Sequence, residues 1–374
     1  MKKILYCLLI FVASHHLHAE SELRMRNLET RVNSLEKSKS ANTPHYDPIT
    51  PNAGPKVYDG MDMFLTTDFI YWTGRLDTLT YARSGSGNFL DVQNPEKGKM
   101  HSVDWGWDPG FKLGYGWTFA RGGWDLFLQY TWFYTNVGDS VETNHLHPSF
   151  EILPPDLKSI LSITPISMKK AHAHWGLHYQ VGDLELGRNY YINRYLKLRP
   201  FIGLKGTWQK QDYNVFYETI PISFQESDLF FDFKTRQDQM LWGIGIRAGL
   251  NTSWQFTKWL SLYGDFALTG IWTHYNIDRK DSYTEIRDEV FLDQLERTTA
   301  YLDGSLEVIK PVFEFSLGLR AETYFHCNQF HVLLQCGWES QLWPSQTLFI
   351  SLSENYDRFD LSLHGLTCKF RFDF

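Results

Sequence analysis

The chain has 374 residues, a formal net charge of −7 and an aromatic content of 16%. Its mean hydropathy is only −0.35, so the chain is rich in aromatic rings without being apolar overall. A bundle of membrane helices is excluded, because each helix needs about 20 consecutive apolar residues and the only apolar run is residues 4–13. The acidic balance argues against nucleic acid as a partner. A closed β-barrel needs apolar residues on one face of each strand only, and so could still cross a bilayer.

The first 60 residues differ from the rest of the chain. Lys2 and Lys3 precede the apolar run, which predicts a signal peptide over residues 1–19 with cleavage near Ala19. Residues 20–40 carry apolar side chains in a heptad spacing of about two turns, which predicts a short periplasmic helix of the coiled-coil type. Alone it is too short to be stable, so it could either reinforce a homo-oligomer, such as a trimer, or remain a frayed leader. Residues 41–60 hold four prolines and are predicted to be an extended linker.

From residue 61 to residue 374 the side chains alternate with a period of two, as in β-strands. Trp124, Leu126 and Leu128 share one face of such a run, for example, and Asp125 and Gln129 share the other. Short turns join the runs at one end and long connections join them at the other, which is typical of outer-membrane barrels with periplasmic short turns. The long connections are expected over residues 84–103, 138–165, 218–237 and 277–307.

Counting the runs predicts an all-β fold, an antiparallel up-and-down transmembrane barrel of about 10 strands, within a range of 10 to 14. The strands are expected near residues 62–82, 104–119, 123–137, 167–190, 195–217, 238–256, 259–277, 309–325, 329–350 and 360–374. The first and ninth runs are long enough to contain a second strand each. An even number of strands places both termini in the periplasm of a Gram-negative bacterium. The chain ends on Phe374, in a row of lipid-facing residues, and a terminal aromatic residue of this kind is the address that the barrel-assembly machinery reads.

Three segments carry a resemblance to a known family. They are residues 64–82 (FLTTDFIYWTGRLDTLTYA), residues 175–208 (WGLHYQVGDLELGRNYYINRYLKLRPFIGLKGTW) and residues 361–374 (LSLHGLTCKFRFDF). With these segments the chain resembles the pore-forming outer-membrane proteins similar to the chlamydial major outer-membrane protein, which are found also in Legionella-like bacteria. The resemblance implies a porin that lets small hydrophilic solutes or ions diffuse passively through the outer membrane. Chlamydial relatives rely on extensive disulfide cross-linking, whereas the chain after residue 19 has three cysteines only, so a cross-linked lattice is not expected.

If the aromatic face of each strand meets lipid, the opposite face lines the pore. Charges of both signs on this face would allow small solutes to pass with weak charge selectivity. Alternatively, these side chains could pair across a narrow interior and fill it. The predicted pore-lining residues are Asp68, Lys112, Asp125, Gln129, His172, His174, His178, Lys197, Arg199, Lys205, Arg247, Asp265, Glu314, Arg320, Glu322, His331, Glu339, Lys369 and Arg371.

Several histidines and aspartates could also support other functions. His172, His174 and His178 share one face of one strand, a spacing that can chelate zinc, but the sequence fixes no further ligand, so we expect solvated histidines and no metal site. An omptin-like protease would use aspartates and histidines at the outer rim to activate water, and the residues available for it are Asp104, Asp108, Asp139, His172 and His174. A structural or adhesive barrel is the third possibility. We predict no enzyme, no cofactor and no catalytic residue.

The three cysteines after the signal peptide are Cys327, Cys336 and Cys368. Cys336 and Cys368 are expected to be small apolar side chains that face lipid. An odd number of cysteines in an exported chain leaves at least one thiol free or paired between chains. Cys327 lies in a predicted periplasmic turn, where it could form an interchain disulfide.

Overall fold

The computed structural model describes residues 52–58, 60–77, 79–86, 97–119, 122–149, 168–220, 222–224, 227–287, 295–352 and 355–374. The chain divides into two units, Met1–Pro51 and Asn52–Phe374, and the second unit contains all of these residues. The predicted signal peptide, the predicted helix over residues 20–40 and most of the predicted linker lie outside the described residues. Among the described residues, no helix is long and apolar enough to cross a membrane.

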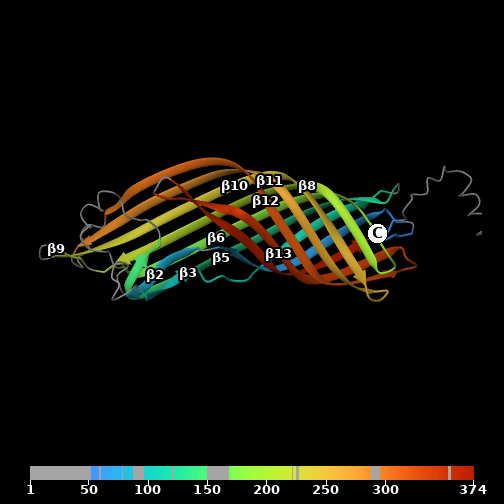
Figure 1. The fold of residues 1–374 in the computed structure, drawn as a ribbon, viewed down its shortest axis with the longest axis horizontal. Coiled ribbons are helices and arrows are strands. Elements are labelled where there is room, and N and C mark those ends of the chain that lie inside the picture. Colours follow the sequence, from blue (N-terminus) through green and yellow to red (C-terminus); the bar gives the residue numbers. More distant parts are fainter. Residues whose placement is uncertain are drawn as a thin grey trace, which may run out of the picture. The chain divides into compact units, whose positions relative to one another are not determined.

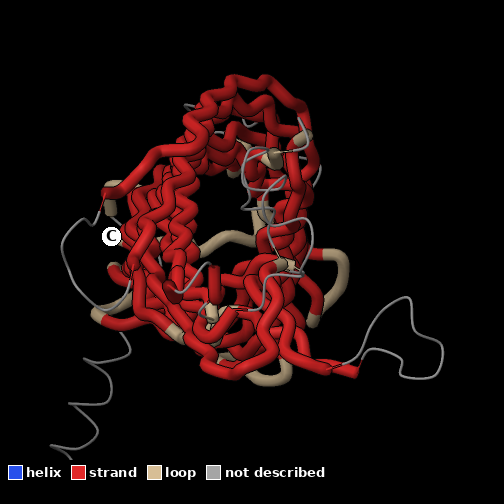
Figure 2. The backbone as a smooth tube through the Cα atoms, turned by 90° about the vertical axis from the view of Figure 1, so that its left-hand side faces the viewer, coloured by secondary structure: helices blue, strands red, loops and turns tan. Residues whose placement is uncertain are grey.

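Ten antiparallel strands form a closed ring in the second unit, which confirms the predicted barrel of about ten strands (Figures 1 and 2). Each strand pairs with its neighbours in the ring, and the ring closes where the first strand pairs with the last. The ring consists of β1 (Met63–Leu76), β4 (Asp108–Thr118), β5 (Trp124–Pro148), β6 (Met168–Arg188), β8 (Leu196–Thr219), β10 (Ser227–Gln255), β11 (Leu260–Arg287), β12 (Leu295–Phe325), β13 (Phe330–Ile350) and β14 (Tyr356–Asp373).

Four shorter strands are attached to this ring: β2 (Thr80–Ser86), β3 (Lys97–Ser102), β7 (Tyr190–Tyr191) and β9 (Ile222–Phe224). β2 and β3 form a hairpin that joins the far end of β5. The run expected over residues 62–82 is therefore two strands, since it breaks after Leu76. The ninth run, in contrast, is the single strand β13.

The C-terminus completes the closure of the ring. The amide nitrogen of Phe374 donates to the carbonyl oxygen of Met63 at 3.0 Å, and the carbonyl oxygen of Phe374 accepts from the amides of Met61 and Met63, both at 3.2 Å. Phe372 and Phe374 stack with their ring centroids 5.8 Å apart. The last residue thus lies in the wall of the barrel, next to the first strand.

Short turns join the strands at one end of the barrel, the end that carries the C-terminus in Figure 1. Gly122 and Gly123, in the turn between β4 and β5, have φ of 79° and 66°, and three consecutive residues of the β12–β13 turn, His326, Cys327 and Asn328, also have positive φ. In outer-membrane barrels this end faces the periplasm.

The strands are longer at the other end than the sequence suggested. β10, β11 and β12 contain 29, 28 and 31 residues, so the connections expected over residues 218–237 and 277–307 are largely strand. The expectation was wrong because it followed the apolar face of each strand, and this face loses its apolar residues partway along the barrel.

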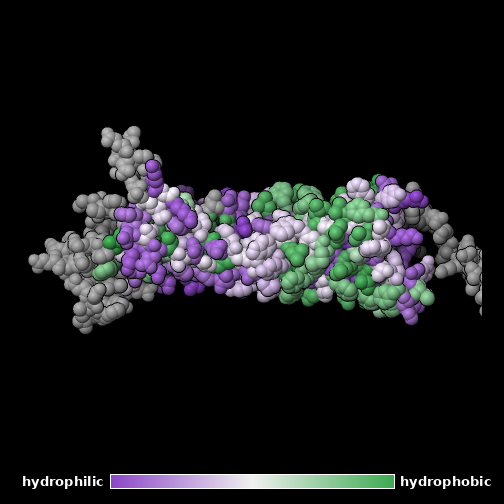
Figure 3. All heavy atoms as spheres, turned by 90° about the horizontal axis from the view of Figure 1, so that it is seen from below, coloured by the Kyte–Doolittle hydropathy of each residue, from purple (hydrophilic) through white to green (hydrophobic). Residues whose placement is uncertain are grey.

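In the half of the barrel next to the short turns, which we call the membrane half, apolar side chains point outward and charged side chains point inward. Leu204 and Ile246 are 47% and 65% exposed on the outside, whereas Lys205, Arg247 and Glu314 on the inside are at most 9% exposed. Figure 3 shows apolar residues gathered across this half on the face that is in view. This is the pattern that a bilayer requires of a barrel wall.

In the other half, which we call the outer half, the pattern is reversed. Trp72, Trp175 and Phe349 point inward and are completely buried in a large apolar core. On the outside of the same half, Asn276 and Lys280 of β11 are exposed. The outer half is therefore built like a water-soluble β-protein, with its apolar residues inside and its polar residues outside.

Cys336 and Cys368 form a disulfide between β13 and β14. The two residues lie directly opposite each other in the register of these strands, on the outward face as expected, but they are bonded rather than independent apolar side chains. Cys327 is a free and exposed thiol in the short turn between β12 and β13.

Candidate functional site

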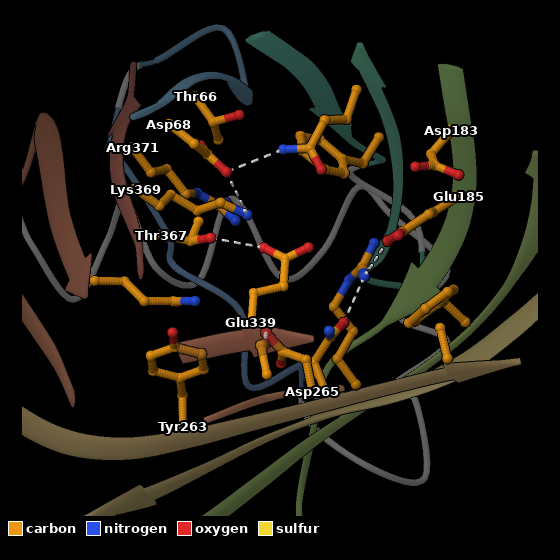
Figure 4. A pocket seen from close by; sticks show the side chains of 18 of the residues that line it. Thr66, Asp68, Asp183, Glu185, Tyr263, Asp265, Glu339, Thr367, Lys369 and Arg371 are labelled. Carbon is orange, nitrogen blue, oxygen red and sulfur yellow. Dashed lines mark hydrogen bonds and ion pairs between the residues drawn. The ribbon is translucent and has the colours of Figure 1, made fainter. Parts of the chain in front are cut away.

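A cavity of about 190 Å³ lies inside the membrane half of the barrel. Each of the ten ring strands contributes side chains to its wall, from the part of the strand that lies in the membrane half. Figure 4 shows how Asp68, Lys369 and Glu339 approach it from one side, with Asp183 and Glu185 on the other. The wall carries both acidic and basic groups, and most of them are arranged in two clusters.

The first cluster centres on Arg247 of β10. Its guanidinium bonds Glu185 and donates to the carboxylate of Glu314, with Nη2 2.7 Å from Oε2. The ammonium of Lys205 lies 2.7 Å from Asp183 and 2.9 Å from the same Glu314. Two cations and three carboxylates from four strands therefore form one network. Because each buried charge has at least one opposite charge in contact, the network avoids the large cost of an unpaired buried ion.

Arg199 extends this network toward the short turns. Its Nη2 lies 2.5 Å from Oδ1 of Asp125, and its Nη1 lies 2.8 Å from Oε2 of Glu185. Glu185 thus accepts from two arginines. The guanidinium of Arg199 also lies 5.5 Å from the ring centroid of Phe201, in a cation–π contact.

The second cluster lies on β1, β4, β13 and β14. The ammonium of Lys112 contacts Glu339 at 2.6 Å, and that of Lys369 lies 3.5 Å from Asp68. The hydroxyl of Thr367 donates to Glu339 at 2.9 Å. This cluster is also balanced in charge, so the wall of the cavity carries charges of both signs on either side without a strong excess of either sign.

Aromatic side chains mark the border of the cavity toward the outer half. The Tyr179 hydroxyl donates to Gln341 at 2.7 Å, and the Tyr179 ring meets the Trp343 ring edge-on with centroids 5.8 Å apart. Lys112 lies 4.8 Å from the centroid of the Trp72 ring. Beyond these rings the buried apolar core begins, and the lumen narrows there to packed side chains.

The structure places sixteen of the nineteen predicted pore-lining residues on the inner face of the membrane half. Asp125 and Lys205 hold ion pairs with cavity residues, and His331 is buried against Asp373 at 2.7 Å. The others line the cavity directly: Asp68, Lys112, Gln129, Lys197, Arg199, Arg247, Asp265, Glu314, Arg320, Glu322, Glu339, Lys369 and Arg371.

His172, His174 and His178 do not line the lumen. They lie on the outer face of β6, where His172 and His178 are exposed, while Ala173 and Trp175 between them point inward and are buried. The prediction was wrong because it assumed that the apolar face of a strand meets lipid along its whole length. In this part of β6 the apolar face fills the barrel instead.

Sequence reasoning missed Asp183 and Glu185, which belong to the Arg247 network. Both lie on the same face of β6 as Trp175 and Tyr179, opposite the face of the three histidines that were predicted to line the pore. The charge of the two residues was itself a signal, since a carboxylate that faces lipid is unfavourable at the depth of the bilayer core.

The residues considered for a protease are not brought together. Asp108 accepts from Thr135 at 2.6 Å and Asp139 accepts from Tyr81 at 2.8 Å, on the inner side, whereas His172 and His174 lie on the outer face. Burial, together with the bond to Asp139, raises the pKa of the Tyr81 phenol, which lies in β2 beyond the membrane half. Within the described residues, no group of three or more His, Cys, Asp or Glu side chains could hold a metal ion.

A closed antiparallel ring with an apolar band outside and charges inside defines the class of outer-membrane β-barrels. The family model of the Legionella pneumophila major outer membrane protein precursor matches residues 55–374, and the chain belongs to this family of outer-membrane proteins. This match confirms the resemblance seen in the sequence. It also confirms that the protein is located in the outer membrane of a Gram-negative bacterium.

Solved structures give more distant likenesses. The outer membrane protease OmpT from Escherichia coli is 11% identical, with a TM-score of 0.35, and the match covers 85% of this chain and 99% of that one. A FadL homologue of Pseudomonas aeruginosa is 8% identical, with a TM-score of 0.25 and coverages of 83% and 89%. The toluene transporter TodX of P. putida is 8% identical, with a TM-score of 0.28 and coverages of 85% and 91%. Such low scores carry no argument about activity. A search of the curated proteins found no match.

Proposed function

We propose that this protein is an outer-membrane porin through which small hydrophilic solutes or ions diffuse passively. The observation that carries the proposal is the cavity inside the membrane half, which is lined by charged side chains of both signs. A barrel interior that is polar at the depth of the lipid suits hydrated solutes, and charges on facing walls can create a transverse field without a net barrier. We therefore expect weak charge selectivity.

Conductance in planar bilayers tests this proposal directly. Purified protein should insert and give stepwise increases of current. In a salt gradient, Lys369→Gln removes a cation from the wall of the cavity, and the reversal potential should shift toward cation selectivity. Lys210→Gln is the matched control, because Lys210 is exposed on the outside of β8 and its loss should leave the reversal potential unchanged. An equal shift in both variants would show that the cavity is not the conducting path.

A second candidate is a structural barrel that conducts nothing. It is favoured by the packed apolar core of the outer half, in which Trp175, Tyr213 and Phe349 are fully buried. A protein that migrates as a folded, heat-modifiable barrel in detergent gels, yet stays silent in bilayers under all voltages, would support this candidate. Peptide hydrolysis is not part of our proposal, and cleavage that is lost in Asp139→Ala or His172→Ala would contradict it.

We further propose that the protein assembles through Phe374 and forms a homo-oligomer, such as a trimer, with the help of residues 20–40. Phe374→Ala should slow insertion into the outer membrane, because the assembly machinery would lose its terminal aromatic. Deletion of residues 20–40 should lower the oligomer fraction in cross-linking of intact cells. An unchanged oligomer after this deletion would remove the role of the segment. A reduction-sensitive dimer that disappears in Cys327→Ser would show an interchain disulfide.

A further inference from the structure

The two strands β12 and β13 part from each other halfway along the barrel. They pair from Phe325 and Phe330 at the short turn up to Phe313 and Leu342, and the described residues show no pairing between them beyond this point. Both strands nevertheless continue, β12 to Leu295 and β13 to Ile350. β12 stays in the ring through its pairing with β11, which runs on to Leu295. The wall therefore has an interruption between β12 and β13 in the outer half.

The outer part of β13 bends into the lumen. Its register with β14 shifts between Trp343 and Thr347, and Ser345 has a φ of 49°, a left-handed conformation that side chains other than glycine adopt rarely. Residues 346–350 that follow are all buried, although in an ordinary barrel strand every second residue faces outward. Residues 347–350 remain paired with residues 356–359 of β14. Residues 344–350 and 356–360 together form what we call the inner hairpin.

The inner hairpin reaches the opposite wall. The Phe349 ring stacks on Tyr213 of β8 with centroids 5.2 Å apart, and the hydroxyl of Thr347 donates to Gln211 of the same strand at 2.7 Å. In the order of the ring, β8 lies four strands from β13. A segment that leaves the wall and contacts a strand so far around the ring must cross the lumen.

Side chains take the place of the missing partner strand. The side-chain carbonyl of Gln239 accepts from the amide of Leu348 at 2.6 Å, and that of Gln237 accepts from the amide of Ile350 at 2.8 Å. Arg279 donates to the carbonyl oxygen of Ile350 at 2.6 Å. Buried backbone groups have to be hydrogen-bonded, so these long polar side chains make the inward position possible. The backbone groups of this segment could exchange these side-chain partners for the backbone of β12, which offers the same kind of hydrogen bond.

We propose that the inner hairpin is a gate, which closes the outer end of the lumen in this structure and opens it by swinging about Pro344 and Ser345 toward β12. If the register between β12 and β13 continued, Ser345 would face Lys310, and the Lys310 ammonium already contacts the Ser345 carbonyl oxygen at 2.5 Å. The hinge would thus keep its neighbour in both positions. The inference rests on the proposed pore, since it names the step that controls passage through it.

Apolar contacts hold the closed position. Leu348 and Ile350 pack with Leu241, Tyr275 and Ile277 in a small core of their own. Swinging the hairpin outward would separate these side chains, so the closed form is expected to dominate and openings to be brief. Above the hinge, residues 347–350 stay paired with residues 356–359 of β14, so the two strand segments would move as a pair, while the Cys336–Cys368 disulfide joins the same strands below the hinge.

Two variants test the gate by conductance in planar bilayers. The double variant Gln237→Ala, Gln239→Ala removes the side chains that replace the partner strand, and the open probability should rise several-fold. Asp238→Ala is the matched control: Asp238 lies between the two glutamines in β10, but its side chain bonds Arg236 outside the inner hairpin's contacts. Folding of each variant is checked by heat-modifiable migration in detergent gels.

The second variant locks the gate. Gln211→Cys with Thr347→Cys, in a Cys327→Ser background, places thiols on β8 and on the inner hairpin, where a short, reducible bifunctional thiol reagent can join them. The cross-linked protein should lose most of its conductance, and reduction should restore it. Conductance that is unaffected by both the cross-link and the glutamine changes overturns the gate and leaves the pore standing. Folded protein that is silent in every form, the glutamine variant included, overturns the pore and the gate with it.

Discussion

Strand β8 has two different environments along its length, and it illustrates how the two halves of the barrel differ. In the membrane half, Lys205 points inward into an ion-pair network while Leu204 beside it meets lipid. In the outer half the same inner face carries Tyr213 and Tyr217 in an apolar core. The backbone and the direction of the side chains continue unchanged, and only their polarity is exchanged. The solvent on each side thus selects the side chains, since water replaces lipid outside the outer half.

The inner face of the membrane half should be the most sensitive to a single change. Arg247→Met leaves Glu185 and Glu314 buried with one cation fewer. Removing one partner of a buried ion pair typically costs about 3–5 kcal/mol, so the free energy of unfolding in urea, measured by the gel shift of the folded barrel, should fall by about this amount. As a control, Arg236→Met alters an ion pair on the exposed outer surface and should have little effect. Equal effects of the two variants would contradict a special role of the inner network.

The inner face of the outer half should respond to lost volume instead of lost charge. Trp175→Ala empties a fully buried site in the apolar core, and such truncations cost about 3–5 kcal/mol, with smaller values where the site can collapse. Trp175→Phe should recover most of the loss because it restores an apolar ring. A site that tolerates Trp175→Ala without destabilisation would mean that the outer half is not packed as described.

The outer face of the membrane half should reject charge. Leu204→Arg puts a cation on the lipid side of the membrane half, where the cost is about 2–4 kcal/mol at the middle of the bilayer and declines toward the interfaces. Unfolding in liposomes measures it, and Leu204→Val serves as the apolar control. A loss as small as that of the control would place the bilayer elsewhere on the barrel.

The outer face of the outer half should tolerate the same charge with almost no effect. Asn276→Arg introduces an arginine on an exposed position of β11, next to the polar outer residues Asp278 and Lys280. Surface substitutions of this kind usually stay within about 0.5 kcal/mol. A large loss in the liposome assay would show that lipid reaches this height. Together with Leu204→Arg, the variant locates the boundary between the two halves.

The sequence was sufficient to predict most of the membrane half. Strict alternation and short turns predicted about ten strands, and the terminal Phe374 indicated the last of them. Charged residues such as Lys112 and Glu339 were correctly assigned to the inside, because lipid excludes them from the other face. The same rule failed for His174 in the outer half and for the carboxylates Asp183 and Glu185 in the adjoining part of the membrane half. A period of two shows which residues share a face, but it does not show which solvent that face meets.

Two features of β13 could not be predicted, for a different reason. The disulfide depends on the register that sets Cys336 opposite Cys368, and the sequence pattern alone does not fix which residues of β13 and β14 face each other when the two cysteines lie 32 residues apart. The inner hairpin depends on a break in the pairing with β12 and on glutamines from β10 that compensate for it. Pro344 and Ser345 were visible in the sequence, yet a proline in a strand is equally compatible with an ordinary edge position.

The Cys336–Cys368 disulfide also reports whether β13 and β14 have paired in their native register. A slip of one residue between β13 and β14 would turn one of the two sulfurs to the opposite face of the sheet, so the bond can close only after the hairpin has reached its native register. Once closed, it retains that register through later steps. The fraction of the protein whose two thiols are unreactive toward an alkylating agent therefore counts the molecules in which this last pair of strands has aligned correctly.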